Sequence, residues 1–594
     1  MTPTSLPALL RERTRQDPGA VAYTFVDYDV NPAGVAQALS WAQAEQRALA
    51  VSEEVARFGK VGDRAAILAP EGLDYIAAFL GALHAGLIAV PLPLPQSRVH
   101  DERVSSALLD CAPAVILTTS GAAAEVSRYA RAQGGAAPPA IIEVDCLDLW
   151  SERDVDAVAR PYPRTAYLQY TSGSTRAPTG VMVSHQNMIA NLGQAGVVYF
   201  EDYGNSPPPG LHLVSWLPFH HDMGLFFSIF TPMYAGTPIT FIKPVSFLQR
   251  PARWLQLLAR YEQTFSCAPN FAFDLAARRT TDADMEGLTL SGVLAIINGA
   301  ERVQPNTIAG FHARFARYGL KPTAIQPSYG LAEATLCVAA PRMGHPVKTV
   351  RFDYEHLTKG HAEPCQSIDI VGSELVSYGP GRAGEGVCSV RIVDPDTGTE
   401  CPPRVIGEIW VHGQNVAAGY WHKPAESTLT FGGRIVDPAP GTPETNWLRT
   451  GDLGAVVDGE LFVMGRLKDM LVVDGRNHYP DDIEATVRDV TGGRAAAICV
   501  PDDRGERLVV IVELADQASS DGAAAQKYRS VKRELLTAIT TSHGLRAADL
   551  VLVPIGALPV TTSGKVRRST CAELYHSNGF HRLDVSASLL EESW

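Results

Sequence analysis

The stretch YLQYTSGSTRAPTGVMVSH, residues 167–185, constrains the fold of this chain more than any other part of the sequence. Its apolar start gives way abruptly to five residues that carry a hydroxyl or no side chain: Thr171, Ser172, Gly173, Ser174 and Thr175. Glycine can take a positive φ, so the N–H groups and hydroxyls of such a loop can approach an anion closely. The pattern therefore predicts a strand that ends in a phosphate-binding loop.

Serine and glycine also fill ordinary surface turns, so these five residues alone are equally typical of a turn. The residues that follow favour binding, because 176–180 continue the loop and the apolar residues 181–183 resume a strand ahead of a helix start at Ser184. The loop differs from the GxxxxGK[ST] loop of P-loop proteins, which ends in a lysine. Thr179 stands near the position where a lysine would be expected.

The first third of the chain alternates strand and helix signals. Strands are expected at 64–70, 87–93, 114–119 and 140–145, and an apolar helix at 74–86. This alternation is typical of an α/β fold with a parallel sheet covered by helices. Doubly wound sheets bind ligands outside the carboxyl ends of their strands, which is where the hydroxyl-rich loop lies.

Length and composition exclude several classes of protein. At 594 residues the chain is too long for one hydrophobic core, so several packed domains are expected. A net charge of −13 disfavours nonspecific binding to nucleic acid or to an anionic membrane. The nine cysteines are scattered without a CxxC pair, as in reduced cytosolic enzymes without a zinc site. The long apolar run at 75–95 is divided by Gly86 and three prolines, so no membrane span is expected.

A His-His-Asp corner lies between a strand and an apolar helix within 214–236. His220 and His221 could be metal ligands, but adjacent side chains rarely point at one ion and no third ligand is evident. A hydrogen-bonded histidine at a strand end is the alternative. Two further strand-to-turn stretches, 295–303 and 324–335, end in small residues suited to close packing against a flat ligand.

The last third changes character. From about residue 385, short strands with turn signals indicate a smaller β-rich subdomain that includes RTGDLG at 449–454. A final unit carries a helix at 526–543 and ends in LPVTTSGKVRR, 558–568, a polar loop that bears Lys565.

Six motifs in this order resemble those of the adenylate-forming superfamily of acyl-CoA synthetases, luciferases and peptide-synthetase adenylation domains: YTSGSTRAPTGV, NGAERV, SYGLAEAT, RTGDLG, GRLKDM and PVTTSGKVRR. Together they cover nearly the whole length of the chain. Within the superfamily, WLPFHHDMGL, APNFAFDLA, GRNHYPDDIE and a residue other than lysine at 179 look most like the fatty acyl-AMP ligases.

This resemblance implies a domain organisation. Residues 1–466 would form a large N-terminal domain of α/β layers, with a β-rich subdomain at 385–466 and a family-type insertion at 343–375. Residues 467–594 would form a small mobile α+β lid, with its hinge at Lys468.

The resemblance also implies where ATP and Mg²⁺ bind. Residues 171–176, including Arg176, would hold the β- and γ-phosphates, and Glu333 would coordinate Mg²⁺, a hard cation that prefers oxygen ligands. A glutamate that only caps a turn is the alternative for Glu333. Asp452 would accept the ribose hydroxyls, and Arg466 would reach ribose or phosphate. Adenine would lie between Gly299, Ala300, Ser328, Tyr329 and Gly330, and Glu301 and Ala332 are also expected to bind ATP.

Lys565 would be the catalytic cation, bridging the acyl carboxylate and the α-phosphate during in-line attack. Two departures from the superfamily pattern accompany this assignment. Ala332 replaces a threonine that many members carry before the metal-binding glutamate, and position 179 lacks the usual lysine. Neither departure removes a group that the chemistry requires.

The substrate follows by elimination. An amino-acid-activating domain needs a buried carboxylate just after Phe219, but two histidines follow it and cannot balance an ammonium group. Apolar residues dominate both flanks of the corner, so a fatty acid tail fits, although such side chains also fill ordinary cores. The expected acyl-binding residues are His220, also assigned to catalysis, Gly224, Leu225, Phe227, Asn270 and Phe271.

We therefore expect a cytoplasmic, monomeric ligase that makes a fatty acyl-adenylate, releases pyrophosphate and transfers the acyl group to a carrier-protein phosphopantetheine. The carrier would be the holo acyl carrier protein of a polyketide or nonribosomal peptide synthase. A fatty acyl-CoA synthetase is the enzyme alternative. A non-catalytic nucleotide-binding protein is disfavoured because Glu333, Asp452 and Lys565 are all present.

The choice of acceptor rests on the insertion. About thirty extra residues precede the glycine-rich turn at 377–384, and Val350, Phe352, Tyr354 and Leu357 are expected to pack on the host. Such a segment could restrain the lid, whose rotation would otherwise complete a CoA site. A plain surface loop is the alternative.

Overall fold

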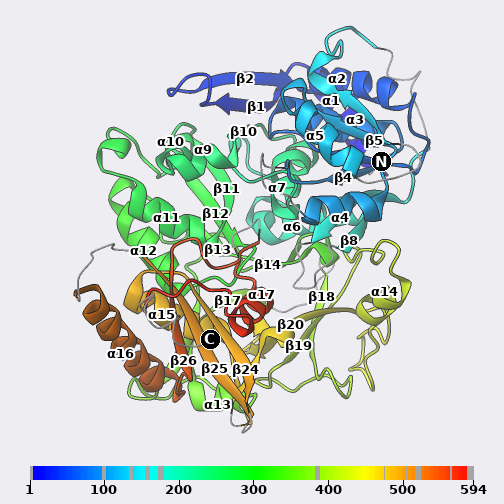
Figure 1. Ribbon diagram of the computed structural model, residues 1–594. Coiled ribbons are helices and arrows are strands. Elements are labelled where there is room, and N and C mark those ends of the chain that lie inside the picture. The colour runs from blue at the N-terminus through cyan, green and yellow to red at the C-terminus, as the bar shows by residue number, and fades with distance from the viewer. Residues whose placement is uncertain are drawn as a thin grey trace. The chain divides into compact units, whose positions relative to one another are not determined.

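The computed structural model describes residues 4–95, 102–132, 138–153, 161–171, 179–380, 388–473, 475–502, 505–515, 523–561 and 565–584. The chain divides into two compact units, whose elements are labelled in Figure 1. Unit 1 consists of Met1–Lys348, Tyr378–Arg391 and Trp410–Thr450. Unit 2 consists of Thr349–Ser377, Ile392–Ile409 and Gly451–Trp594.

A six-stranded sheet in unit 1 has the order β6-β5-β3-β4-β7-β8. Its strands are β3 (Arg64–Ile67), β4 (Ile88–Pro91), β5 (Val115–Thr118), β6 (Ala140–Glu143), β7 (Thr165–Thr171) and β8 (Thr179–Ser184). All neighbours are parallel except β7 and β8, which pair antiparallel. Helices alternate with the parallel strands: α3 (Leu73–His84), α4 (Glu102–Cys111) and α5 (Ser120–Ala132), with the 3₁₀ turn η1 (Val144–Cys146) after β6. The predicted alternation is confirmed.

A seven-stranded sheet, also in unit 1, has the order β13-β12-β11-β9-β10-β1-β2. Its strands are β1 (Val21–Asp27), β2 (Val35–Ser40), β9 (Leu211–Ser215), β10 (Ile239–Phe241), β11 (Gln263–Pro269), β12 (Val293–Gly299) and β13 (Ile325–Pro327). The strands run parallel apart from the β1–β2 hairpin. The chain thus has the predicted α/β class with parallel sheets.

Helices of unit 1 flank these sheets or connect their strands. They are α1 (Leu6–Gln16), α2 (Trp41–Val55), α6 (His185–Phe200), α7 (Asp222–Leu225), α8 (Thr231–Ala235), α9 (Pro244–Gln249), α10 (Ala252–Leu258), α11 (Asn270–Arg279), α12 (Pro305–Phe315) and α14 (Pro424–Phe431). Short helical turns are η3 (Glu201–Tyr203), η4 (Phe226–Phe230), η5 (Ala283–Met285), η6 (Ala316–Tyr318) and η7 (Ala332–Ala334), and a small pair joins β14 (Tyr329–Gly330) to β15 (Cys337–Ala339). The predicted helix start at Ser184 is confirmed by a capping box, in which Ser184 and Asn187 each accept the other's backbone N–H at 3.0 Å.

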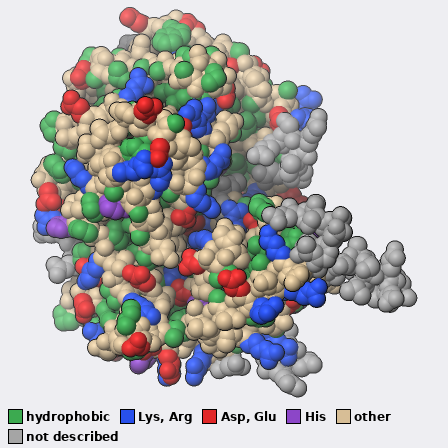
Figure 2. All heavy atoms as spheres, turned by 90° about the vertical axis from the view of Figure 1, so that its left-hand side faces the viewer, with side chains coloured by type: hydrophobic (Ala, Val, Ile, Leu, Met, Phe, Trp, Pro, Cys, Tyr) green, Lys and Arg blue, Asp and Glu red, His purple; other side chains and the backbone are tan. Residues whose placement is uncertain are grey.

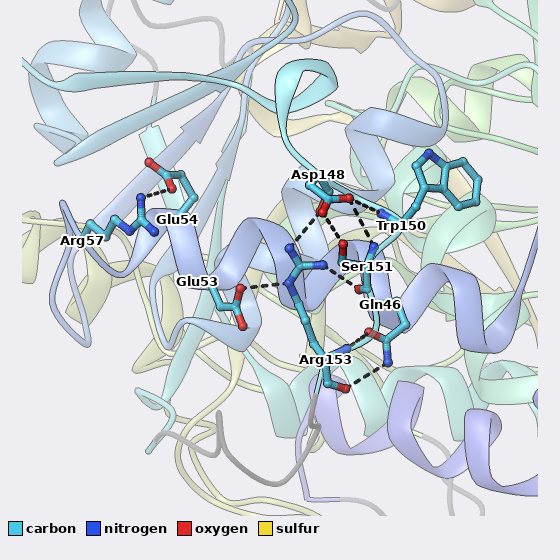
Figure 3. A network of polar contacts seen from close by, with 8 residues as sticks. All are labelled: Gln46, Glu53, Glu54, Arg57, Asp148, Trp150, Ser151 and Arg153. Carbon is cyan, nitrogen blue, oxygen red and sulfur yellow. Dashed lines mark hydrogen bonds and ion pairs between the residues drawn. The ribbon is translucent and has the colours of Figure 1, made fainter.

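Polar contacts fix the segment after β6 on helix α2, as Figure 3 shows. The Arg153 N–H donates to Gln46 Oε1 at 2.7 Å, and its guanidinium reaches Glu53 Oε2 at 2.8 Å. The same guanidinium also donates to the carbonyl oxygens of Ser151 and Asp148, each at 2.8 Å. This irregular segment therefore keeps its backbone polar groups paired where it crosses the helix.

A third sheet has the order β16-β17-β21-β20-β19-β18. Its strands are β16 (Thr349–Asp353), β17 (Gly372–Pro380), β18 (Ser389–Val393), β19 (Gly407–His412), β20 (Leu448–Val457) and β21 (Glu460–Arg466), with helix α13 (Tyr354–Thr358) after β16. The expected β-rich region at 385–466 contributes four of these strands. The other two come from the expected insertion and the strand that follows it.

The C-terminal part of unit 2 is a smaller α+β assembly. It comprises the 3₁₀ turn η8 (Leu467–Asp469), the hairpin β22 (Leu471–Val473) with β23 (Arg476–His478), the sheet strands β24 (Ala495–Asp502), β25 (Gly505–Leu514) and β26 (Asp549–Pro554), and helices α15 (Pro480–Thr491), α16 (Ala523–His543) and α17 (Arg568–His576). Helix α16 starts three residues before its predicted position and ends, as predicted, at a glycine with φ of 62°.

Buried apolar side chains form separate cores. The largest cluster lies in unit 1, and another joins α15, α16 and the three-stranded sheet of unit 2. Figure 2 shows acidic and basic side chains interspersed over one face of the molecule. Within the described ranges, no helix combines the length and apolar character needed to cross a membrane.

Candidate active site

The two strands that carry the predicted phosphate loop end side by side. β7 and β8 pair so that Thr171 lies opposite Thr179. The residues between them that were expected to bind phosphate, Ser172, Gly173, Ser174, Thr175 and Arg176, lie outside the described residues. Thr171 and Thr179 therefore mark the two ends of the loop.

Glu333, the expected Mg²⁺ ligand, lies in the turn η7. The Tyr420 hydroxyl donates to Glu333 Oε1 at 2.9 Å, and the Ala417 N–H donates to the Glu333 carbonyl at 2.9 Å. Burial beside this carboxylate raises the pKa of Tyr420, so the phenol stays protonated and can donate. In the parts of the chain that are described, no group of three or more His, Cys, Asp or Glu residues is arranged to hold a metal ion by itself. One carboxylate is nevertheless compatible with Mg²⁺, which often binds through one or two carboxylates and substrate phosphates.

The segment 417–423 was not singled out in the sequence, yet it runs along β8. The Met182 N–H donates to the Gly419 carbonyl at 2.9 Å, and the Trp421 N–H donates to the Gly180 carbonyl at 2.8 Å. At its end the Lys423 ammonium donates to Thr179 Oγ1 at 2.9 Å. Its aromatic pair and lysine, GYWHKP, were the available signal, but no sequence spacing relates them to a loop about 240 residues earlier.

The structure brings the two predicted adenine-binding stretches together. The Ser328 N–H donates to the Asn298 carbonyl at 2.8 Å, and a Cβ on Gly299 would lie 3.0 Å from the Ser328 carbonyl oxygen. Ala300 has a φ of 65°, a conformation that a non-glycine residue rarely adopts outside constrained sites. Gly330 admits no side chain, since its Cβ would meet the Leu336 carbonyl oxygen at 1.8 Å. These residues, with Tyr329 and the buried Ala332, all belong to unit 1.

Tyr199 supports this region from helix α6. Its hydroxyl donates to Ser328 Oγ at 2.8 Å and lies 3.8 Å from Cys337 Sγ. The ring is buried, and burial raises the pKa of the phenol well above its ordinary value. No sequence pattern connects this residue with the SYGLAEAT motif.

Glu301 and Asn270 connect the adenine side to the acyl side. The Phe271 N–H donates to Glu301 Oε1 at 2.6 Å at the start of helix α11. Asn270 accepts hydrogen bonds from the Asn298 amide and the Gln304 N–H, each at 3.1 Å. Both predicted binding residues therefore have structural partners within the protein, and their roles toward a ligand stay predictions.

His220 lies in the corner between β9 and α7 and is largely buried. Its Nδ1 lies 3.8 Å from Glu71 Oε1, and its carbonyl accepts a hydrogen bond from Gln169 Nε2 at 2.8 Å. Within the described residues its Nε2 has no hydrogen-bond partner. Burial, with a smaller contribution from His221, lowers the pKa of His220 well below its usual value, so the ring is neutral near pH 7.

The apolar stretch after the corner contains a π-helical turn, η4, which the sequence did not predict. Such turns are rare and occur often at functional sites. Gly224 approaches the chain too closely for a side chain, since its Cβ would lie 2.0 Å from the Pro218 carbonyl oxygen. Leu225 and Phe227 are buried, and Phe227 stacks on Phe265 with ring centroids 6.0 Å apart. These contacts also suit an ordinary core, so acyl binding by these residues remains a prediction.

Asp452 and Arg466 lie in unit 2, directly opposite each other on β20 and β21. Arg466 Nε is 3.5 Å from Asp452 Oδ1. Nearby, the buried Glu408 carboxylate accepts the Gly451 N–H at 2.9 Å, which fixes the turn before Asp452. The expected ribose-binding pair is thus preassembled within this unit.

Lys565 also belongs to unit 2. Its N–H donates to Thr561 Oγ1 at 3.0 Å, and its carbonyl accepts the Thr561 N–H at 2.8 Å. Three residues on, Arg568 binds both carboxylate oxygens of Glu484 at 2.7 Å and reaches Asp469 at 3.2 Å. Asp469 follows the predicted hinge Lys468, so the buried Arg568 ties the loop of Lys565 to the hinge region.

Comparisons with known proteins identify the family. The AMP-binding enzyme family matches residues 10–421, and the family described as Disco-interacting protein 2-like, AMP domain, matches residues 468–584. Long-chain-fatty-acid–AMP ligase FadD26 of Mycobacterium marinum is 55% identical over 99% of this chain and 100% of its own length. The 4-hydroxyphenylalkanoate adenylyltransferase of the same organism is 53% identical over 99% of this chain and 94% of its own.

A solved structure agrees with these relatives. The fatty acyl-adenylate ligase of Legionella pneumophila, determined in complex with acyl adenylate and pyrophosphate, is 32% identical to this chain. The match covers 98% of each chain with a TM-score of 0.71. Because the family match, the sequence relatives and the fold agree over nearly its whole length, the chain belongs to the AMP-binding enzymes and, within them, to the fatty acyl-AMP ligases.

Proposed function

We propose that this chain uses ATP and Mg²⁺ to activate a long-chain fatty acid and passes the acyl group to the phosphopantetheine thiol of an acyl carrier protein. One observation carries the first half of the proposal: segment 417–423 binds both Glu333 and Thr179, so the expected metal ligand and the end of the phosphate loop are held together. Full-length identity to a long-chain-fatty-acid–AMP ligase supports the same chemistry.

In the proposed reaction a carboxylate oxygen of the fatty acid attacks the α-phosphorus of ATP. A bond forms between that oxygen and phosphorus, the bond to the β-phosphate oxygen breaks, and pyrophosphate leaves. Thr171 and the loop after it would hold the leaving phosphates, Glu333 would hold Mg²⁺, and Asp452 would accept the ribose hydroxyls. The metal supplies neutralisation of phosphate charge when bound.

Lys565 would stabilise the charge that builds between the two reacting anions. Unit charges 4 Å apart interact by about 4 kcal/mol at an effective dielectric of about 20, so one cation can account for several powers of ten in rate. His220, which is neutral, would contribute a hydrogen bond to the acyl carboxylate rather than a charge. Its buried Nε2 is the atom available for such a contact among the described residues.

The second half of the proposal concerns the acceptor and rests on the insertion. Phe352 and Leu357 are buried in a core cluster with residues of β20 and β21, as the sequence predicted. The Tyr354 hydroxyl is 2.9 Å from His478 Nδ1, and the Ser373 hydroxyl donates to Asp482 Oδ1 at 3.0 Å. The insertion is therefore bonded to β23 and α15, which belong to the expected lid. We infer that these bonds restrain the rotation that would complete a CoA site, which leaves a carrier protein as the acceptor.

Two classes of carboxylic acid are candidates for the substrate. The relative that is 53% identical is a 4-hydroxyphenylalkanoate adenylyltransferase, so an acid with an aromatic end is the second candidate substrate. Both classes present the same carboxylate to Lys565 and differ only at the far end of the chain. We favour the long aliphatic acid because the side chains after the corner, Leu225 to Phe230, are apolar except Ser228.

Pyrophosphate release tests this function. The wild-type chain is incubated with ATP, Mg²⁺ and saturated acids of graded length, and in parallel with 4-hydroxyphenylalkanoic acids of matched length. We expect release with the long aliphatic acids and formation of the corresponding acyl-adenylate by mass spectrometry. Release only with the aromatic acids would transfer the proposal to the second class, and no release with any acid would refute it.

A further inference from the structure

A cation lies where the phosphate loop ends, although the loop itself has none at that position. Lys423, which precedes helix α14, donates from its ammonium to Thr179 Oγ1 at 2.9 Å. Thr179 is the first described residue after the loop and lies opposite Thr171 on the paired strand. The charge missing from position 179 is thus supplied in space by position 423.

The backbone fixes this arrangement. Bonds from Met182 to Gly419 and from Trp421 to Gly180 align segment 417–423 with β8 along its length. An isolated β-bridge between Val181 and Tyr420 completes the pairing. The position of Lys423 relative to Thr179 therefore follows from strand pairing and not from a flexible surface side chain.

The same segment contacts the expected metal ligand. Tyr420, three residues before Lys423, donates to Glu333 Oε1 at 2.9 Å. One segment thus places a hydrogen-bond donor on the carboxylate expected to hold Mg²⁺ and a cation at the end of the expected phosphate loop. The two contacts thus reach two groups that the proposed function places beside the triphosphate.

The surroundings of Lys423 suit a phosphate-binding cation. Its side chain is 24% exposed, which weakens screening by water and strengthens its interaction with a nearby anion. Its ion-pair partner Glu426, at 3.6 Å, is 59% exposed, so that pair is weak. Thr179 accepts from the ammonium through its oxygen and keeps its own hydroxyl proton to donate to a phosphate.

We propose that Lys423 is a nucleotide-binding residue that contacts the β- or γ-phosphate, in place of a lysine at the end of the loop. This inference deepens the proposed function, because it rests on ATP being the substrate. It predicts a selective effect: nucleotides with a β-phosphate and free pyrophosphate depend on Lys423, whereas AMP does not.

Nucleotide titration without fatty acid tests the proposal. We expect Lys423→Met, which keeps the length and removes the charge, to weaken ATP and pyrophosphate binding by about tenfold or more while AMP affinity changes by less than about twofold. Lys423→Arg should retain most of the ATP affinity. Equal losses for ATP and AMP, or an unchanged ATP affinity, would overturn the proposal.

Moving the cation from position 423 to position 179 makes the test independent of local misfolding. In the double variant Thr179→Lys with Lys423→Met, the cation returns to the loop end, and we expect ATP and pyrophosphate affinity to recover to within about threefold of wild type. Glu426→Gln is the matched control, since it breaks the ion pair of Lys423 but keeps the cation, and should leave ATP affinity unchanged. A loss in Glu426→Gln as large as that in Lys423→Met would assign Lys423 to holding helix α14 and would contradict phosphate binding.

The role of Lys423 and the proposed function can fail separately. Should wild-type protein bind neither ATP nor pyrophosphate, the proposed function fails. Should wild type bind both, with Lys423→Met binding them equally well, only the role of Lys423 is wrong.

Discussion

At the scale of single residues, the groups expected to act on ATP fall into two sets held by different means. Glu333 and Thr179 are fixed in unit 1 by backbone pairing and by Tyr420 and Lys423. The chain that follows Lys565 is fixed in unit 2 through the largely buried Arg568, whose carboxylate partners hold its pKa well above the ordinary value. Breaking such a buried pair by removing one partner typically costs about 3–5 kcal/mol. The position of Lys565 thus depends on an ion pair that the sequence motif alone does not reveal.

Lys565→Ala is expected to abolish acyl-adenylate formation while leaving ATP affinity within about tenfold, because this cation should act mainly in the transition state. Pyrophosphate release and nucleotide titration measure the two effects separately. Arg567→Ala, two residues on, is the matched control and should keep most of the activity. Unchanged turnover in Lys565→Ala would remove this residue from the mechanism.

The buried histidine His84 predicts how the stability of the fold depends on pH. Burial lowers the pKa of His84 from 6.5 to about 4, and within the described residues its Nε2 has no partner. As pH falls below 6.5, the unfolded chain binds a proton that the folded chain excludes, so stability is lost between pH 6.5 and about 4. We expect the melting temperature of His84→Leu to fall less steeply than that of wild type when the pH is lowered from 7 to 5. An equal fall in melting temperature for the two proteins would show that His84 does not contribute to the pH dependence of stability.

At the scale of elements, the insertion is a strand and a helix rather than a loop. β16 pairs with β17 through five residue pairs, and Phe352 packs edge-on against Phe462. Deleting 345–370 would therefore remove an edge strand and open a core, which would confuse a loss of folding with a change of acceptor. Substituting only the bonds to β23 and α15 is the sharper experiment.

The double variant Tyr354→Phe with Ser373→Ala removes two hydroxyls that bond the insertion to His478 and Asp482. We expect acyl-CoA formation to rise by about tenfold, because the two lost hydrogen bonds each contribute about 0.5–1.5 kcal/mol to the restraint. Acyl-adenylate formation should stay near wild type. Thr349→Ala is the control, because its hydroxyl bonds Glu374 within the β16–β17 pair. No rise in acyl-CoA would argue against restraint by these bonds.

Elements that follow simple periodicity can be predicted from the sequence, whereas contacts created by long-range pairing cannot. The alternation of 64–70 with later strands and helices, the cap at Ser184 and the buried face of the insertion are local patterns, and they are confirmed. Tyr199, Tyr420 and Lys423 were missed because each meets the site through contacts across more than 80 residues of chain. Their own surroundings in the sequence carry no periodic signal.

At the scale of the whole molecule, the residues expected to act on ATP are divided between the two units, and the bonds proposed to decide the acceptor lie within one of them. Unit 1 contains Glu333, Lys423 and the apolar corner, and unit 2 contains Asp452, Lys565 and the insertion from Thr349 onward. The family membership establishes the adenylate-forming chemistry. The choice of a carrier protein as the acyl acceptor goes beyond what family membership establishes.

Mass spectrometry of both acylated products tests the choice of acceptor. Wild-type chain, ATP, Mg²⁺ and a long-chain fatty acid are incubated with equal concentrations of CoA and a holo acyl carrier protein of the polyketide or nonribosomal peptide synthase type, and acyl-carrier and acyl-CoA are quantified together. We expect acyl-carrier to exceed acyl-CoA by about tenfold or more. Acyl-CoA as the main product, formed as fast as the adenylate, would contradict it and identify the chain as an acyl-CoA synthetase.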